Sequence, residues 1–390
     1  MQRYVFFIVN TSFFVILYEV LKSIEMKETP KFVISGGGTG GHIFPAIAIA
    51  DTLKKKFPQA EILFIGAQGR MEMEKVPKAG YPIEGLWISG LTRDRRALTL
   101  PAKLFSSFNK AARILRRFKP DVVIGVGGFA SGPTLKVANI LRIPTVLQEQ
   151  NSIPGKTNRN LAQRASVICV AYPDMDKWFP ADKVVYTGNP LRSKVASGMP
   201  REEAAAFFGL DPEKPVALLI GGSQGSRDMN HGISAQLAAF KDKDLQFIWQ
   251  TGKDYQGQAQ EEVNALGLQD QVKPVAFIER MDLAYSVADV VISRAGAMSI
   301  SELSLMQKPV IFVPLPSAAE DHQTKNAMQL VNAGAALIVK NDKVKEELVP
   351  ALFELAADKG KQETMKQNIV AFARPHAADD IAEQIAKLIK

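Results

Sequence analysis

One glycine-dense segment carries the residues best suited to bind and activate a substrate. Five glycines stand between Gly36 and Gly41, and His42 follows directly. The mainly apolar residues 31–35 predict a buried strand before the segment, and Pro45 suits the first turn of a helix after it. A strand, a glycine turn and a helix start offer backbone N–H groups to an anion such as phosphate. His42 would stand beside that anion, where an imidazole can accept a proton near neutral pH.

The same segment matches the dinucleotide-binding pattern G-x-G-x-x-G through Gly36, Gly38 and Gly41. That pattern alone is weak evidence. A nicotinamide or flavin site needs an acidic residue at the end of the second strand to hold the ribose. The second predicted strand covers residues 61–66, and its acid, Glu61, stands at the wrong end. An oxidoreductase is therefore disfavoured, and a tight turn without a ligand is the simplest alternative.

Two further glycine-rich segments follow predicted strands. Residues 125–133 include Gly127 and Gly128, and residues 221–226 include Ser223. Three such loops, spread over both halves of the chain, indicate places where phosphate or sugar approaches the backbone. The sequence has no G-x-x-x-x-G-K-[ST] motif, so ATP hydrolysis by a P-loop is disfavoured.

A fourth candidate segment, residues 293–303, begins at the end of a predicted strand and enters a helix. Small residues at its turn leave N–H groups free for a diphosphate. Glu302 lies about one turn inside the helix, where it could accept ribose hydroxyls or could be a solvated acid favoured by the helix dipole. Residues 314–327 form another polar loop before a helix, which is either a sugar-binding segment or a surface connection.

A basic segment lies between residues 92 and 119, where nine Lys and Arg side chains accompany a single acid, Asp94. Cationic residues beside exposed apolar ones suit an anionic membrane surface. The simpler alternative is a helix whose apolar face, including Phe105 and Leu115, packs in the core. Nucleic acid could use the same charge, but neither an aromatic stacking platform nor a recognition motif accompanies it, so we expect no nucleic acid partner.

Composition bounds the class of protein. The 390 residues are 46% hydrophobic, which suits two domains with cores of their own, and the net charge of +8 favours an anionic partner. The single Cys169 excludes a disulfide framework and a cysteine metal cluster, and fits a reducing compartment. The four histidines lack metal-ligand spacing, so we expect no metal.

The first 26 residues differ from the rest of the chain. Residues 4–18 are mostly apolar but too short and too interrupted for a membrane span, and no small-residue cleavage site follows them. The segment is either a marginal anchor or translated upstream sequence, with Met26 as the working start. We favour the second interpretation.

Strands and helical stretches alternate along both halves of the chain. This alternation predicts an α/β fold with a parallel sheet and helices on both faces in each half. The turn-rich residues 188–192 mark the boundary, and an amphipathic helix closes the chain. We expect two Rossmann-like domains at residues 27–190 and 191–368, a final helical segment at 369–390, and a ligand cleft at the carboxyl ends of the strands.

In this order along the chain, the motifs resemble those of the bacterial peptidoglycan N-acetylglucosaminyltransferases that convert lipid I into lipid II. The matching segments are residues 36–42, 125–133, 149–151, 188–192, 221–225, 294–302 and 321–326. The resemblance implies the two-domain glycosyltransferase B fold, with the last helix crossing back to the N-terminal domain. It implies inverting transfer of N-acetylglucosamine from UDP-N-acetylglucosamine to polyprenyl-diphosphate-linked muramyl peptide, without a cofactor, at the cytoplasmic face of the membrane.

The resemblance also implies roles for single residues. In the C-terminal domain, Ile278 and the turn at residues 294–298 would hold uracil and phosphate, Glu302 the ribose, and Gln323 the sugar hydroxyls. The substrate-binding residues would be Thr39, Gly40, Gly41, Asn151, Arg192, Ser223, Ile278, Arg294, Ala297, Met298, Ser299, Glu302 and Gln323, with Gly127 and Gly128 at the acceptor diphosphate. The membrane patch would comprise Arg93, Arg95, Arg96, Leu98, Leu100 and Lys103.

The transfer needs a base for the acceptor hydroxyl, and His42 is the first candidate, with Glu149 in reserve. A structural role for His42 stays open. Gln148 stands where some relatives carry histidine, which weakens the case for a second catalytic histidine. Two other functions also stay open: another UDP-sugar enzyme of this architecture, such as an epimerase, and a non-catalytic protein that binds the nucleotide sugar.

Overall fold

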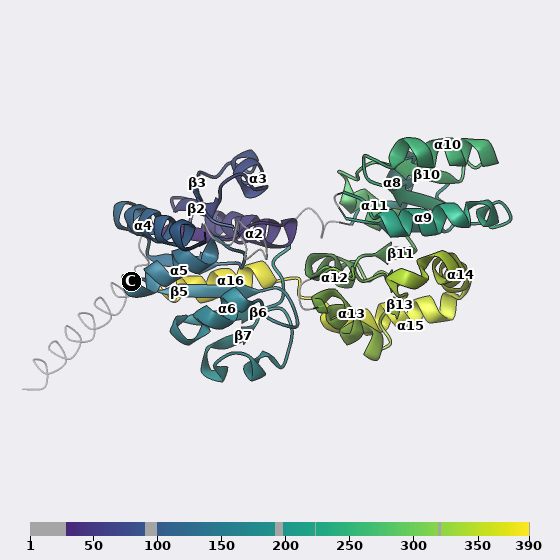
Figure 1. The fold of residues 1–390 in the computed structure, drawn as a ribbon. Helices are drawn as coiled ribbons and strands as arrows, with labels where there is room; N and C mark the ends of the chain where they lie inside the picture. Colours follow the sequence, from purple (N-terminus) through teal and green to yellow (C-terminus); the bar gives the residue numbers. More distant parts are fainter. Residues whose placement is uncertain (1–28, 90–99, 192–197, 223, 319–320, 390) are drawn as a thin grey trace, which may run out of the picture.

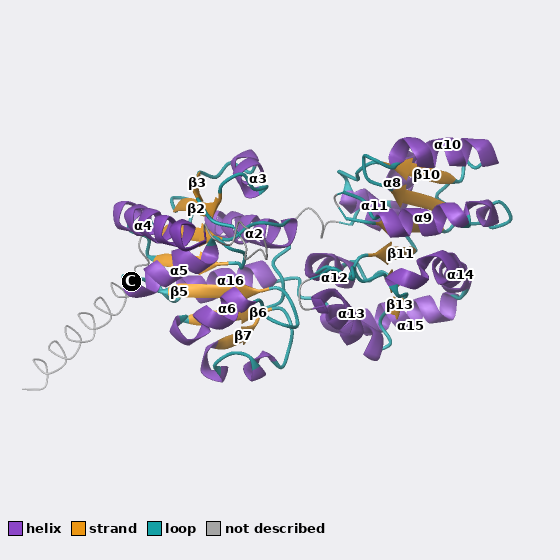
Figure 2. Cartoon of the chain, in the orientation of Figure 1, coloured by secondary structure: helices purple, strands orange, loops and turns teal. Residues whose placement is uncertain are grey.

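Two parallel sheets organise the computed structural model of the chain, which describes residues 29–89, 100–191, 198–222, 224–318 and 321–389. The first sheet has seven strands in the order β3-β2-β1-β4-β5-β6-β7, and the second has six in the order β10-β9-β8-β11-β12-β13. Every neighbouring pair of strands is parallel. Each sheet has helices around it, and the two layered units, here called the first and second lobes, lie side by side (Figures 1 and 2).

The first lobe contains the strands β1 (Lys31–Ser35), β2 (Glu61–Ala67), β3 (Ile83–Leu86), β4 (Val122–Gly125), β5 (Thr145–Glu149), β6 (Val167–Val170) and β7 (Val184–Tyr186). Its helices are α2 (Gly40–Lys56), α3 (Glu72–Lys78), α4 (Leu100–Phe118), α5 (Ser131–Ile140) and α6 (Lys156–Leu161). Short 3-10 turns connect several of these elements. The central strands β1, β2, β4, β5 and β6 are almost entirely buried, as parallel strands covered by helices on both faces must be, whereas the edge strands β3 and β7 are partly exposed.

The second lobe contains β8 (Val216–Ile220), β9 (Gln246–Gln250), β10 (Val272–Val275), β11 (Val290–Ser293), β12 (Val310–Phe312) and β13 (Leu337–Ile338). The helices of this half of the chain are α8 (Arg201–Phe208), α9 (Arg227–Ala235), α10 (Gln256–Leu266), α11 (Met281–Val287), α12 (Ala297–Leu305), α13 (His322–Asn332), α14 (Val344–Ala357), α15 (Lys359–Ile369) and α16 (Ala377–Ala386). The alternation of strands and helices confirms the α/β prediction for both halves. Within the described ranges, no helix is both long enough and apolar enough to cross a bilayer.

The last helix, α16, belongs to the first lobe in space although it ends the chain. Ile381, Ala382 and Ile385 are fully buried in the core that β1 and α2 share. Figure 1 shows this yellow helix among the elements of the first lobe, close to α2. The expected return of the final helix to the N-terminal domain is therefore confirmed. The exact domain limits stay a prediction, although the expected boundary near residue 190 falls between β7 and α8.

Helix α2 begins earlier than the sequence suggested. It starts at Gly40, so Pro45 lies inside the helix, and the expectation that Pro45 stands in the first turn is wrong. Thr39 is the N-cap residue, with extended backbone (φ −144°), and its carbonyl accepts the N–H groups of His42 and Ile43. The helix can therefore begin on the glycines, which brings His42 into its first turn.

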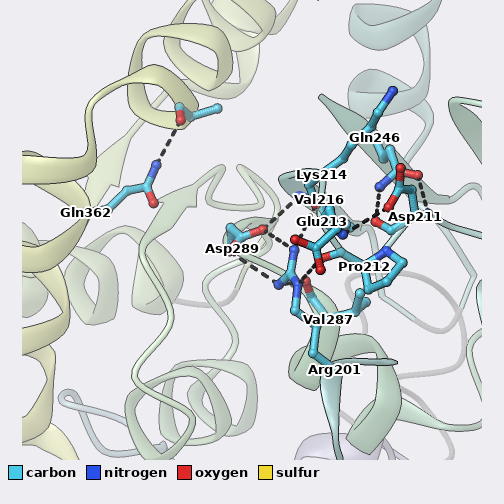
Figure 3. Close-up of polar contacts among 12 residues, drawn as sticks. Arg201, Asp211, Pro212, Glu213, Lys214, Val216, Gln246, Val287, Asp289 and Gln362 are labelled. Carbon is cyan, nitrogen blue, oxygen red and sulfur yellow. Dashed lines mark hydrogen bonds and ion pairs between the residues drawn. The ribbon is translucent and has the colours of Figure 1, made fainter. Parts of the chain in front are cut away.

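Arg201, the first residue of α8, fastens this helix to the second sheet. Its guanidinium donates to the carbonyls of Pro212 (2.7 Å), Lys214 (2.8 Å) and Val287 (2.9 Å), and pairs with Asp289 at 3.0 Å (Figure 3). The same Asp289 carboxylate accepts the N–H of Val216 at the start of β8 (2.8 Å). One cation thus holds the segment that enters the second lobe against the amino ends of β8 and β11.

Candidate active site

The predicted glycine loops follow the two strands of each sheet between which the strand order reverses. In the first sheet this point falls between β1 and β4, and in the second between β8 and β11. Open parallel sheets bind ligands at the carboxyl ends of the strands at such a point. Residues 36–39 and 126–130 follow β1 and β4, and residues 221–226 and 294–296 follow β8 and β11. The four segments selected from the sequence therefore border the two expected ligand positions.

The two glycine loops of the first lobe touch each other. A Cβ atom on Gly128 (φ +84°) would lie 2.2 Å from the carbonyl oxygen of Gly37. A Cβ atom on Gly127 (φ +86°) would lie 2.9 Å from Cε1 of the His42 ring. Both positions need glycine because of backbone conformation and because of space. The absence of a side chain at Gly127 therefore lets the imidazole pack directly against the backbone.

Glu72, the first residue of α3, holds the first glycine loop from behind. Its side chain is buried, and its carboxylate accepts the N–H groups of Gly38 and Ala67, each at 2.9 Å. A Cβ atom on Gly37 would lie 2.3 Å from this carboxylate. No local pattern in the sequence marks Glu72, because its partner in the loop stands 34 residues away.

We expect Glu72→Gln to loosen the loop. A glutamine amide keeps one acceptor oxygen, but its NH₂ group then faces a backbone N–H that has lost its partner, at a cost of about 2 kcal/mol in the free energy of unfolding. Urea denaturation measures this cost. The matched control is Glu74→Gln on the same helix, where the exposed carboxylate pairs with Lys78 at 2.7 Å and with Lys75 at 3.7 Å and contributes little to stability. An equal loss in both variants would contradict the anchoring role.

His42 contacts a glutamine rather than a carboxylate. Its Nδ1 atom lies 3.0 Å from Oε1 of Gln150. Burial lowers the pKa of His42 below its ordinary value of 6.5, and the charge of His322 lowers it further. Three groups oppose this shift: the charge of Glu149, the bond to Gln150 and the carbonyl of Val126. The ring is therefore neutral near pH 7, the state that a general base requires.

Glu149, the reserve base, lies at the end of β5 with both carboxylate oxygens engaged. It is 2% exposed. One oxygen accepts the N–H of Asn151 (3.1 Å) and its side-chain amide (3.3 Å). The other accepts the N–H of Gly155 (3.1 Å) and the amide of Asn158 (2.9 Å). This carboxylate organises the turn at residues 150–155, which carries Gln150 and Asn151.

Hydrogen bonds from that turn reach the second lobe. Asn326 in α13 accepts from the N–H (3.0 Å) and the hydroxyl (2.8 Å) of Ser152, and its amide donates to Asn151 (3.1 Å). A separate contact joins the lobes at Asn189, which follows β7. Its amide donates to the hydroxyl of Ser301 in α12 (3.0 Å). The carboxyl-end loops of the first sheet thus meet the helices that follow β11 and β12.

Helix α12 presents its first turn at the second ligand position. Ala297, Met298 and Ser299 open the helix and supply the N–H groups expected for a diphosphate. Glu302 follows, and its carboxylate accepts the hydroxyl of the buried Tyr285 at 2.9 Å. Burial, followed by the Glu302 charge, raises the pKa of Tyr285, so this phenol stays a donor. Tyr285 thus fixes the orientation of Glu302, a role that no motif in the sequence marks.

Arg294 lies under the turn rather than on it. Its guanidinium donates to the carbonyls of Val313 (3.0 Å) and Pro314 (3.1 Å), to Asn341 (2.7 Å) and to the hydroxyl of Ser226. Burial lowers the pKa of Arg294, and Asp228 opposes the shift. The side chain therefore joins its own loop after β11 to the loops that follow β8, β12 and β13.

Two other predicted donor-site residues lie at the rim of the second lobe. The Gln323 side chain, in the first turn of α13, accepts the N–H of Leu315 at 2.9 Å and so fixes the loop before the helix. Ile278 is buried beside a surface hollow of about 410 Å³, which exposed Phe207 and Phe277 also line. Arg192 and Ser223 lie outside the described residues.

Only part of the predicted membrane patch lies within the described residues. Arg93, Arg95, Arg96 and Leu98 fall outside them. Leu100 and Lys103 occupy the first turn of α4, and Lys103 donates to Ser89 (3.0 Å) and lies 5.9 Å from the ring centre of Trp87. Phe105 is 74% exposed and Trp87 48% exposed, whereas Leu115 packs in the core. The start of α4 therefore combines a cation with uncovered apolar side chains.

Family models and curated relatives match nearly the whole chain. The glycosyltransferase family 28 N-terminal domain matches residues 32–170, and the glycosyltransferase family 28 C-terminal domain matches residues 216–385. The chain is 49% identical over 367 residues to a protein of Christiangramia forsetii, covering 93% of this chain and 99% of that protein. It is 50% identical over 365 residues to one of Parabacteroides distasonis, covering 92% and 98%. Both are named UDP-N-acetylglucosamine--N-acetylmuramyl-(pentapeptide) pyrophosphoryl-undecaprenol N-acetylglucosamine transferase.

Solved structures agree with this assignment. The crystal structure of Acinetobacter baumannii MurG superposes with a TM-score of 0.75 at 29% identity, covering 92% of this chain and 99% of that one. A UDP-GlcNAc 2-epimerase from Neisseria meningitidis superposes with a TM-score of 0.64 at 16% identity, covering 92% and 100%, which shows a shared fold alone. The resemblance drawn from the motifs is confirmed. This chain belongs to glycosyltransferase family 28, and within it to the family of the UDP-N-acetylglucosamine--N-acetylmuramyl-(pentapeptide) pyrophosphoryl-undecaprenol N-acetylglucosamine transferases.

Proposed function

We propose that this chain transfers N-acetylglucosamine from UDP-N-acetylglucosamine to the muramyl sugar of a polyprenyl-diphosphate-linked muramyl peptide, a step of peptidoglycan synthesis. The observation that carries the proposal is the pair of ligand positions at facing sheet edges, in a chain about half identical to transferases of that name over more than nine-tenths of its length. Each position has its own glycine loop and helix start, as two phosphorylated substrates require.

The acceptor hydroxyl attacks the anomeric carbon from the side opposite the departing UDP, so the configuration inverts. His42 accepts the hydroxyl proton as the new glycosidic bond forms and the bond to the diphosphate oxygen breaks. The electron pair of that bond leaves with UDP. The buried Glu149 supports the reaction by shaping the turn at residues 150–155, because its oxygens are already occupied by four donors.

The charge that grows on UDP would be met by the first turn of α12, where Ala297, Met298 and Ser299 supply N–H groups and the positive end of the helix dipole. Arg192 and Ser223 would add donors, and Glu302, held by Tyr285, would bind the ribose. Thr39, Gly40 and Gly41 would face the donor from the first lobe, and Gly127 and Gly128 the acceptor diphosphate. No cofactor enters this scheme.

The direct test is UDP release by the purified full chain with UDP-N-acetylglucosamine and a lipid I analogue. We expect UDP only when the acceptor is present, together with a disaccharide product detected by mass spectrometry. Release of free UDP or formation of an epimerised sugar without acceptor would instead identify another UDP-sugar enzyme. Binding of the donor without any product would identify a non-catalytic binding protein.

The acceptor's lipid places the reaction at a membrane surface, and we propose that the start of α4 and the basic residues before it bind the cytoplasmic face. Exposed Phe105 and Trp87 beside Lys103 support this docking. Nucleic acid is not part of the proposal.

Charge reversal at Arg95, Arg96 and Lys103 is expected to lower binding to vesicles that contain anionic lipid by more than about 100-fold, because the loss of three cations alone removes about 3 kcal/mol of attraction and the new carboxylates repel the surface. Vesicle sedimentation measures this loss. The matched control reverses Lys54, Lys55 and Lys56, three basic residues in the last turn of α2. Equal losses in the two triple variants would assign the binding to net charge rather than to this patch.

A further inference from the structure

Gln150 bonds to the ring of His42, and the neighbouring groups determine which way the Gln150 amide points. The side chain is 2% exposed. Its amide nitrogen donates to the carbonyls of Val126 (2.9 Å) and Gln148 (3.3 Å) and also to Oε1 of Gln148. Since these partners are acceptors, the nitrogen must face them. Oε1 of Gln150 must then face His42.

We propose that Gln150 is a positioning residue that holds neutral His42 in the tautomer protonated on Nδ1. An oxygen acceptor 3.0 Å from Nδ1 requires an N–H there, so the lone pair of the ring lies on Nε2. Nε2 is therefore the atom that accepts the proton of the acceptor hydroxyl. This inference rests on the proposed function for its catalytic meaning, but the tautomer itself is a property of the free protein.

The glutamine is in turn held by a chain of hydrogen bonds that runs in one direction. Gln148 accepts from Gln150 and donates through its own amide to Asn189 at 3.0 Å. Asn189 donates to Ser301 (3.0 Å), and Ser301 donates to the carbonyl of Ala297 (3.0 Å). Each member uses an oxygen to accept and a proton to donate. The orientation of His42 is thus tied to the first turn of α12.

A neutral orienting group suits this base. Glutamine supplies the acceptor without a negative charge, so it orients the ring while burial keeps the pKa of His42 low. The titratable groups that act on the ring are Glu149 at the end of β5 and His322 in α13. Of these, only Glu149 raises the pKa, and its carboxylate is occupied by the turn at residues 150–155.

The test is nitrogen NMR of the full chain carrying ¹⁵N-labelled histidine, with the His42 signals identified by their absence in His42→Ala. At neutral pH, we expect the wild-type ring to be protonated on Nδ1 and unprotonated on Nε2. Gln150→Leu should give a mixture of tautomers and lower turnover about 10- to 100-fold at nearly constant donor KM. Gln150→Glu should keep the Nδ1 proton but move the acidic limb of the kcat/KM profile to higher pH.

The matched control is Gln362→Leu, which removes another buried glutamine (labelled in Figure 3). Its amide donates to the carbonyls of Leu355 (2.8 Å) and Ala356 (3.0 Å). It should lose stability as Gln150→Leu does, without changing the His42 signals. A wild-type ring protonated on Nε2, or an unchanged tautomer in Gln150→Leu, would overturn the inference. Absence of transferase activity with an intact Nδ1 tautomer would overturn the proposed function instead.

Discussion

Replacing His42 by alanine is expected to lower turnover by about 10²–10⁴-fold, the usual contribution of a general base, while the affinity for UDP-N-acetylglucosamine changes little. The ring rests on Gly127 and contacts Gln150, both in the first lobe, whereas the expected donor contacts lie mainly in the second lobe. Removing the imidazole therefore removes a proton acceptor and leaves the nucleotide site in place.

Steady-state rates with a lipid I analogue and calorimetry with the donor measure the two quantities separately. His376→Ala, at an exposed position before α16, is the control and should behave as wild type. The pH profile gives a second check. Because burial lowers the pKa of His42, the acidic limb of kcat/KM should fall below pH 6.5 and should vanish in the alanine variant. A variant with weaker donor binding and full turnover would contradict the base role.

Glu149→Gln is expected to lose stability and activity together. In wild type, one carboxylate oxygen accepts from Asn151 twice, and the other accepts from Gly155 and Asn158. In the variant, the NH₂ group replaces one of these oxygens, so the two donors on that side lose their acceptor. Leaving two buried donors without acceptors should lower the free energy of unfolding by roughly 3 kcal/mol. The turn at residues 150–155 would shift, moving Gln150 away from His42, and turnover should fall by about 10²-fold.

Chemical denaturation and turnover distinguish this organising role from the alternative in which Glu149 is the base. A true base would lose turnover in Glu149→Gln while the folded protein kept its stability. The control is Glu61→Gln, where a surface carboxylate pairs with Lys31 at 2.7 Å and is half exposed. That pair contributes little to stability, so both measurements should stay near wild type.

The strands were predictable from the sequence because their signal is local. Runs such as residues 216–220 and 290–292 are apolar throughout, and parallel strands covered on both faces require such runs. The glycine loops were predictable for the same reason, since Gly127 and Gly128 lie next to each other in the chain. The start of α2 was placed wrongly because Pro45 suggested a helix start, whereas Thr39 caps the helix six residues earlier.

The supporting residues of the site were not predictable, because each acts on a distant part of the chain. Gln150 lies 108 residues from His42, and Asn189 lies 112 residues from Ser301. Neither a local pattern nor a composition signal marks a buried amide that must meet such a partner. Arg294 shows the converse: its position in a motif indicated a ligand contact, whereas its side chain bonds to three other loops, those after β8, β12 and β13.

The placement of α16 has a consequence for the order of synthesis. Ile381, Ala382 and Ile385 fill the core beside α2, yet they are synthesised only after the whole second lobe. At about 5–20 residues per second, the nascent first lobe waits many seconds with that apolar surface uncovered. The growing polypeptide therefore exposes this apolar face while the second lobe is being made, and a product that terminates before α16 keeps the face uncovered in its N-terminal half.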